Sequence, residues 1–173
     1  MQQYIFTTSS TWFKISGNVS VSGDINTLID GVGGEDITLK DYIYYKLFSG
    51  CTGLTDASNL KLPSKNLKPN SYANMFESCT GLTSAPKELP ATSLAEKCYQ
   101  GMFIGCTSLN KISVKFIDWN TSYSSTTDWV DGVAPKGTFI CPDELTKDYG
   151  INNIPNGWTV KHPEYLTFTA NEQ

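Results

Sequence analysis

The chain has 173 residues, of which 39% are hydrophobic, and it carries a formal net charge of −4. This length suits a single domain, and a mean hydropathy of −0.25 without a long apolar run predicts no membrane-spanning helix. All 13 basic residues are lysine, whereas nucleic-acid-binding proteins usually gather arginine and lysine on one face, so that class is disfavoured.

Residues 1–37 are predicted to form an N-terminal β cap. Apolar and polar residues alternate over residues 13–16 and 19–22, and Gly17 and Gly23 suit the turns of a β-hairpin or small sheet. The first residues show neither the basic nor the apolar region of a secretory signal peptide. We therefore expect either a signal further upstream in a longer protein or a chain that is not secreted by that route.

Internal repetition dominates residues 38–117. The pattern Phe-x-x-Cys-Thr-x-Leu begins at Phe48, Phe76 and Phe103, so successive copies lie 28 and 27 residues apart. Such a period indicates units that bury their apolar faces against one another. The predicted repeat core consists of Leu39, Tyr44, Phe48, Cys51, Leu54, Leu67, Tyr72, Met75, Phe76, Cys79, Leu82, Leu94, Tyr99, Met102, Phe103, Cys106 and Leu109.

Each copy is predicted to be a helix followed by a short strand. Ser93 and Glu96 have the spacing of a helix-capping box, and Thr38 and Asn66 can cap the other copies. After the cysteine of each copy, alternation predicts a half-buried strand, as in residues 109–112. The expected fold is therefore an α/β solenoid of about three helix–strand coils.

Residues 118–163 are predicted to close this stack as a C-terminal cap. A strand over residues 137–141, a short helix over residues 143–149 and a closing strand within residues 154–160 would make a strand–helix–strand unit. Trp129 and Trp158 are expected to seal it. Residues 164–173 would be a tail or the start of a following module, because residues 165–169 are strand-like.

The segment LPATSLAEKCYQGMFIGCTSL, residues 89–109, resembles the repeat of BspA-like leucine-rich-repeat surface proteins of gut and oral anaerobic bacteria. The resemblance covers roughly residues 13–160, although the third copy runs into a Ser/Thr-rich loop at residues 121–127. It implies a right-handed leucine-rich-repeat solenoid displayed outside the cell. It also implies adhesion or ligand binding without reaction chemistry.

The five cysteines could form a metal site or a disulfide frame, or they could be buried thiols. The sequence has no C-x-x-C, and its single histidine, His162, lies beyond the repeat. Cys51, Cys79 and Cys106 occupy one repeat phase, which favours a column of small buried thiols. An odd number of cysteines leaves at least one thiol free unless chains are cross-linked.

Acidic residues give no coherent catalytic or metal site. Paired carboxylates can hydrolyse glycosides, but the candidate pairs lie in turn or capping contexts: Glu35/Asp36, Asp128/Asp131 and Asp143/Glu144. The stretch from Asp24 to Glu35 lacks the oxygen ligand and the glycine of a calcium loop. We therefore predict no catalytic residue, no metal and no cofactor.

Trp119, Asn120 and Tyr123 form the candidate binding patch, because aromatic faces beside amides can stack on sugar rings. The leading hypothesis is a non-enzymatic interaction or adhesion module of a bacterial cell-surface or secreted protein. It would bind a protein or glycan through a rigid repeat surface, within a longer chain of several modules. Two alternatives remain: a carbohydrate-binding module that uses exposed aromatics, and a structural or host-attachment component of a bacteriophage virion.

Overall fold

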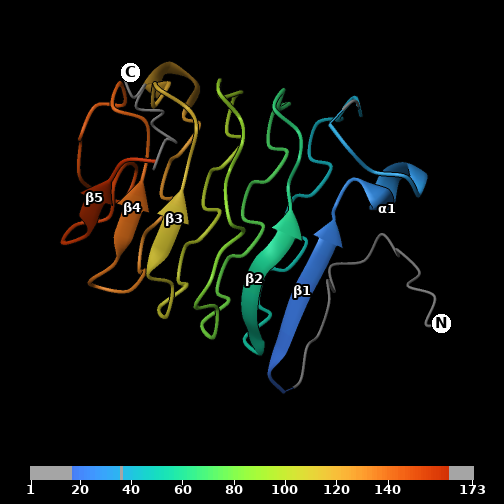
Figure 1. The fold of residues 1–173 in the computed structure, drawn as a ribbon, viewed down its shortest axis with the longest axis horizontal. Coiled ribbons are helices and arrows are strands. Elements are labelled where there is room, and N and C mark those ends of the chain that lie inside the picture. Colours follow the sequence, from blue (N-terminus) through green and yellow to red (C-terminus); the bar gives the residue numbers. More distant parts are fainter. Residues whose placement is uncertain (1–16, 36, 164–173) are drawn as a thin grey trace, which may run out of the picture.

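The structure is a computed structural model that describes residues 17–35 and 37–163. Its strands lie side by side in chain order and point the same way (Figure 1): β1 (Val19–Asp24), β2 (Leu54–Lys61), β3 (Lys111–Ser113), β4 (Thr138–Ile140) and β5 (Thr159–Lys161). Strands β1 and β2 form one parallel sheet. Strands β3, β4 and β5 form a second parallel sheet.

Residues 83–89 fill the interval between β2 and β3. Ser84 forms a parallel bridge with Asp56, and Leu89 forms one with Val114. The Ala57 N–H donates to the Ser84 carbonyl at 2.8 Å, and the Leu89 N–H donates to the Ser113 carbonyl at 2.9 Å. This segment therefore links the two sheets into one parallel-stranded side of the molecule.

The predicted solenoid of helix–strand coils is wrong. In the described part of the chain, helical structure is limited to α1 (Thr27–Asp30) and the 3₁₀ turn η1 (Thr121–Tyr123). The segments after Thr38, Asn66 and Ser93 consist of consecutive turns. The molecule is instead built mainly of small parallel sheets and turns.

A left-handed backbone at every fourth residue is what excludes the helices. In the second copy, Asn70, Asn74 and Ser78 have φ of 56°, 54° and 59°. The matching positions of the third copy, Lys97, Gly101 and Gly105, are also left-handed. An α-helix needs φ near about −63° at each residue. These segments therefore turn back at regular intervals instead of continuing as helices.

The resulting turn segments are residues 42–50, 70–78, 97–105 and 124–132. Their alternate backbone N–H groups bond to a neighbouring copy, not to the carbonyl four residues earlier as in an α-helix. The N–H groups of Tyr72, Asn74 and Phe76 donate to the next copy, at Cys98 (3.0 Å), Gln100 (2.8 Å) and Met102 (2.9 Å). Intervening amides bond three residues back, as Ala73 does to Asn70 at 3.2 Å. Neighbouring copies are therefore joined along their turn segments as well as along their strands.

Side chains of the repeat stack in register inside the molecule. The rings of Phe48 and Phe76 lie 5.4 Å apart, and those of Phe76 and Phe103 lie 5.6 Å apart. Tyr44, Tyr72 and Tyr99 form a parallel column. Separations of about 4.5–7 Å allow favourable offset stacking. Every residue of the predicted repeat core is buried in this cluster.

The two ends match the sequence predictions in part. Strand β4 lies within the predicted strand at residues 137–141, and β5 overlaps the end of the predicted closing segment, residues 154–160. Residues 143–149 contain turns in place of the predicted helix. The indole N–H of Trp129 donates to the Asn153 carbonyl at 2.8 Å, and that of Trp158 donates to the Ala134 carbonyl at 2.7 Å. The predicted strands at residues 13–16 and 165–169 lie outside the described residues.

Candidate functional site

Three overlapping hollows lie along the sheets, with volumes of about 320, 610 and 430 Å³. The first two share Asn59, Lys87 and Lys111, and the last two share Lys111 and Ile140. Together they extend from β2 across residues 83–87 and β3 to β5. We call this depression the sheet-face groove.

Strand geometry turns polar side chains into the groove. Successive residues of a strand point to opposite faces, and Ile112 of β3 is buried while Lys111 is exposed. Parallel register places Lys111 beside Thr138 of β4, and Ser113 beside Ile140, which in turn adjoins Lys161 of β5. The outward positions of the parallel side therefore form the groove.

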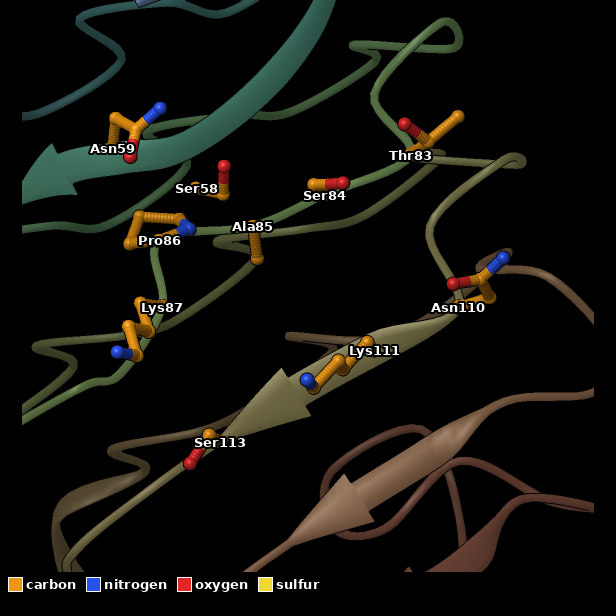
Figure 2. Close-up of a pocket in the computed structure, with 10 residues that line it drawn as sticks. All are labelled: Ser58, Asn59, Thr83, Ser84, Ala85, Pro86, Lys87, Asn110, Lys111 and Ser113. Carbon is orange, nitrogen blue, oxygen red and sulfur yellow. The ribbon is translucent and has the colours of Figure 1, made fainter. Parts of the chain in front are cut away.

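Figure 2 shows the hollow between β2 and β3. Asn59 comes from β2, Lys87 from the intervening segment, and Lys111 and Ser113 from β3. Asn110 lies at the other end of the hollow, just before β3. Side chains from three neighbouring copies thus contribute to one surface.

Most of these polar groups have no partner within the protein. In residues 17–35 and 37–163, no hydrogen bond or ion pair involves the side chains of Asn59, Ser84, Lys87, Asn110, Lys111 and Ser113. By contrast, the Thr83 hydroxyl donates to the Thr55 carbonyl at 2.9 Å. The groove therefore presents donors and acceptors that are free for a ligand.

The groove is basic although the chain is acidic. Four lysines line it, Lys61, Lys87, Lys111 and Lys161, whereas the chain as a whole has a net charge of −4. The one lining carboxylate among the described residues, Glu88, pairs with Lys115 at 3.0 Å. A hollow lined by one sign of charge concentrates ligands of the other sign.

The predicted patch of Trp119, Asn120 and Tyr123 does not gather into an exposed surface. Trp119 is buried, and its indole N–H donates to the Thr146 carbonyl at 3.1 Å. The Asn120 amide donates to the Leu94 carbonyl at 2.7 Å. Tyr123 is 55% exposed. Stacking on a sugar ring would need a free indole face, and that of Trp119 packs in the aromatic core.

All five cysteines are buried, and none is joined to another by a disulfide. The Cys79 thiol donates to the Phe48 carbonyl and the Cys106 thiol donates to the Phe76 carbonyl, both at 3.0 Å, so each links two copies. Burial raises the pKa of Cys79 to about 12. Because the thiolate is the reactive form, these groups are poor nucleophiles and metal ligands.

Several acidic groups and the histidine have partners within the protein. Asp24 accepts the N–H groups of Asn26 at 2.8 Å and Gly34 at 2.9 Å. His162 Nδ1 lies 2.7 Å from an Asp143 carboxylate oxygen. Within the described residues, no cluster of three or more His, Cys, Asp or Glu could hold a metal. In the same part of the chain, no helix is long and apolar enough to cross a bilayer.

Comparisons of the chain with protein-family models, with curated proteins and with solved structures gave no match. The likeness to BspA-like surface proteins therefore stays a prediction from the repeat sequence. Reasoning from the sequence did not identify the sheet-face groove. The sequence did contain one indication of it, namely polar residues at the outward positions of each alternating segment, such as Lys111 and Ser113.

Proposed function

We propose that the chain is a non-enzymatic interaction module, on a bacterial surface or secreted, that binds a protein or glycan through the sheet-face groove. The observation that supports this most is the row of outward polar side chains without intramolecular partners. The buried side-chain amide of Asn26, by contrast, is bonded to Gly34 and Ser64. The groove is therefore a surface whose bonding capacity is available to another molecule.

The backbone beneath the groove is held in place before any ligand arrives. Strand β4 is paired on both sides, and the turn segments bond from copy to copy. A ligand would therefore meet side chains on a fixed frame, which reduces the entropy lost on binding. This arrangement suits recognition through many weak polar contacts.

The lining favours binding over catalysis. General acid–base chemistry needs a titratable group within hydrogen-bonding reach of the reacting atoms. The lining carboxylate Glu88 pairs with Lys115, and His162 faces Asp143. Lysine, serine, threonine and asparagine side chains make up most of the polar lining that remains.

Filling the groove tests the proposal. Ser84→Tyr would place a ring among the lining residues, whereas Thr121→Tyr adds a ring at an exposed position outside it. In a screen of immobilised glycans and extracellular-matrix proteins, we expect wild type and Thr121→Tyr to bind the same ligand. Ser84→Tyr should lose about tenfold or more in affinity, which corresponds to one or two polar contacts.

Thermal unfolding of all three proteins provides the folding control. Binding that survives in Ser84→Tyr, or a wild type without any ligand in the screen, would contradict the proposal. Turnover of a bound ligand that disappears when one carboxylate is replaced would contradict its non-enzymatic character.

A further inference from the structure

We infer that the ligand of the sheet-face groove is a polyanionic glycan, one whose sugars carry carboxylate or sulfate groups. This inference rests on the proposed function and names the ligand class of the same groove. It follows from where the lysines lie, from what surrounds them and from the character of the remaining lining.

The lysines are spread along the groove, on different strands and segments. Ser113 is in register with Ile140 and Ile140 with Lys161, and Lys111 precedes Ser113 by two residues. With strands about 4.8 Å apart and about 3.3 Å per residue, the Cα atoms of Lys111 and Lys161 are about 12 Å apart. Lys87 adds a third charge on the segment before β3. An extended ligand with several separated negative charges fits this row.

The ammonium groups are not neutralised from within. In the described ranges, no carboxylate lies within ion-pair distance of Lys87, Lys111 or Lys161. Other lysines do pair: Lys65 contacts Glu35 at 2.7 Å and Lys46 contacts Glu77 at 3.1 Å. The groove therefore keeps its positive charge on a chain with a net charge of −4, and it attracts a polyanion selectively.

The rest of the lining favours a glycan over other polyanions. The free hydroxyls and amides of Ser84, Asn110 and Ser113 match the hydroxyls of a sugar chain. Strand β4 is paired with β3 on one side and with β5 on the other, so an acidic peptide could not join it as an added strand. Among the residues that the structure describes, no Phe, Tyr or Trp lines the hollows. Single-stranded nucleic acids, by contrast, bind largely by base stacking on such rings.

Charge reversal with a matched control tests this inference. The groove variant is Lys87→Glu, Lys111→Glu and Lys161→Glu combined. The control variant is Lys40→Glu, Lys68→Glu and Lys136→Glu, at exposed positions outside the groove. Both change the net charge equally. A third protein with glutamine at the three groove positions separates loss of attraction from added repulsion.

The probes are heparin, which carries sulfate and carboxylate groups, polygalacturonate, which carries carboxylate groups alone, dextran as a neutral glycan, polyglutamate and single-stranded DNA. We expect wild type and control to bind heparin or polygalacturonate but not dextran, and more weakly as salt rises. The groove variant should bind the acidic glycans at least about tenfold more weakly than wild type. Three substitutions are combined because a single exposed charge contact contributes little. The glutamine variant should fall between the two.

Equal losses in the groove and control variants would overturn the inference, as would polyglutamate or DNA binding as tight as glycan binding. No binding to either acidic glycan would also overturn it. Ser84→Tyr could instead abolish binding of another ligand whose affinity is the same in the charge-reversal variant and in wild type. In that case the proposed function stands, and the inference of a polyanionic glycan fails. If neither change affects any ligand, both proposals fail.

Discussion

Backbone conformation at single positions of the turn segments carries much of the fold. The left-handed positions recur with the repeat and hold residues such as Asn74, Gly101 and Asp128. Asparagine and glycine adopt this conformation readily, whereas other residues pay about 1–2 kcal/mol. Lys97, with φ of 51°, is therefore a strained position.

Lys97→Gly should raise the free energy of unfolding by about 1 kcal/mol, because it removes the side-chain clash of the left-handed backbone. Within the described residues, Lys97 forms one ion pair, which spans 3.9 Å to the exposed Glu96. Such a surface pair contributes little to stability. Gln100→Gly, at a position without positive φ, is the control. It should lower stability, and urea unfolding of both variants checks the prediction. Equal destabilisation by the two changes would contradict it.

The buried Cys98 thiol should make stability fall in alkaline solution. Burial raises its pKa to about 12, whereas the pKa of a thiol in an unfolded chain is about 8.5. The folded state thus keeps a proton that the unfolded state releases. The stabilisation is complete below the unfolded pKa and is lost as pH rises toward 12.

In wild type the free energy of unfolding should fall as pH rises between about 9 and 11. Cys98→Ala should make this fall less steep by about 1 kcal/mol per pH unit. The variant also loses packing contacts, which lowers its stability equally at every pH. Met102→Ala, at another buried position without a titratable group, should keep the wild-type slope. Denaturant unfolding measured at several pH values checks this. A Cys98→Ala slope parallel to wild type would be inconsistent with a protonated buried thiol.

Among the elements, the turn segments show where the sequence was informative and where it misled. Apolar residues four apart, namely Leu94, Cys98 and Met102, predicted a helical face, and they are indeed buried together. A chain of turns that repeats every four residues places the same residues on one side. The spacing of buried residues therefore cannot distinguish an α-helix from this chain of turns. The feature of the sequence that indicated left-handed turns was the presence of Gly101 and Gly105 in the predicted helix.

The strands were more predictable than their lateral arrangement. Alternation located the strands that became β4 and β5. The groove depends on which residues of different copies stand side by side, as Lys111 does with Thr138. That register follows from backbone hydrogen bonds between copies, which no local pattern specifies. Trp119 was predicted on a surface for its chemical type, but the aromatic core buries it.

Neighbouring copies approach closely just before β4, so replacing Gly137 should cause a large loss of stability. A Cβ there would lie 2.5 Å from the Asn110 carbonyl oxygen and 2.6 Å from the Trp158 ring. Gly137→Ala should cost about 2–3 kcal/mol, since the backbone must move. Gly105→Ala, which meets nothing nearer than 3.5 Å, should cost only about 1 kcal/mol from its left-handed backbone. Thermal unfolding compares them, and equal losses would argue against the tight approach.

For the molecule as a whole, stacking of copies creates both the core and the groove. The same offset that brings Phe76 over Phe103 brings successive outward strand positions onto one surface. A ligand that contacts Lys87, Lys111 and Lys161 would touch several copies at once. The function proposed above therefore depends on the pairing of copies along their whole length.

Nuclear magnetic resonance couplings across hydrogen bonds test this pairing most directly. We predict a coupling from the amide nitrogen of Phe76 to the carbonyl carbon of Met102, and one from the amide nitrogen of Tyr72 to the carbonyl carbon of Cys98. In these two hydrogen bonds the nitrogen and the carbonyl oxygen lie 2.9 and 3.0 Å apart. Couplings from each of these amides to the carbonyl four residues earlier in its own copy would instead show helices and would contradict the stacked turns.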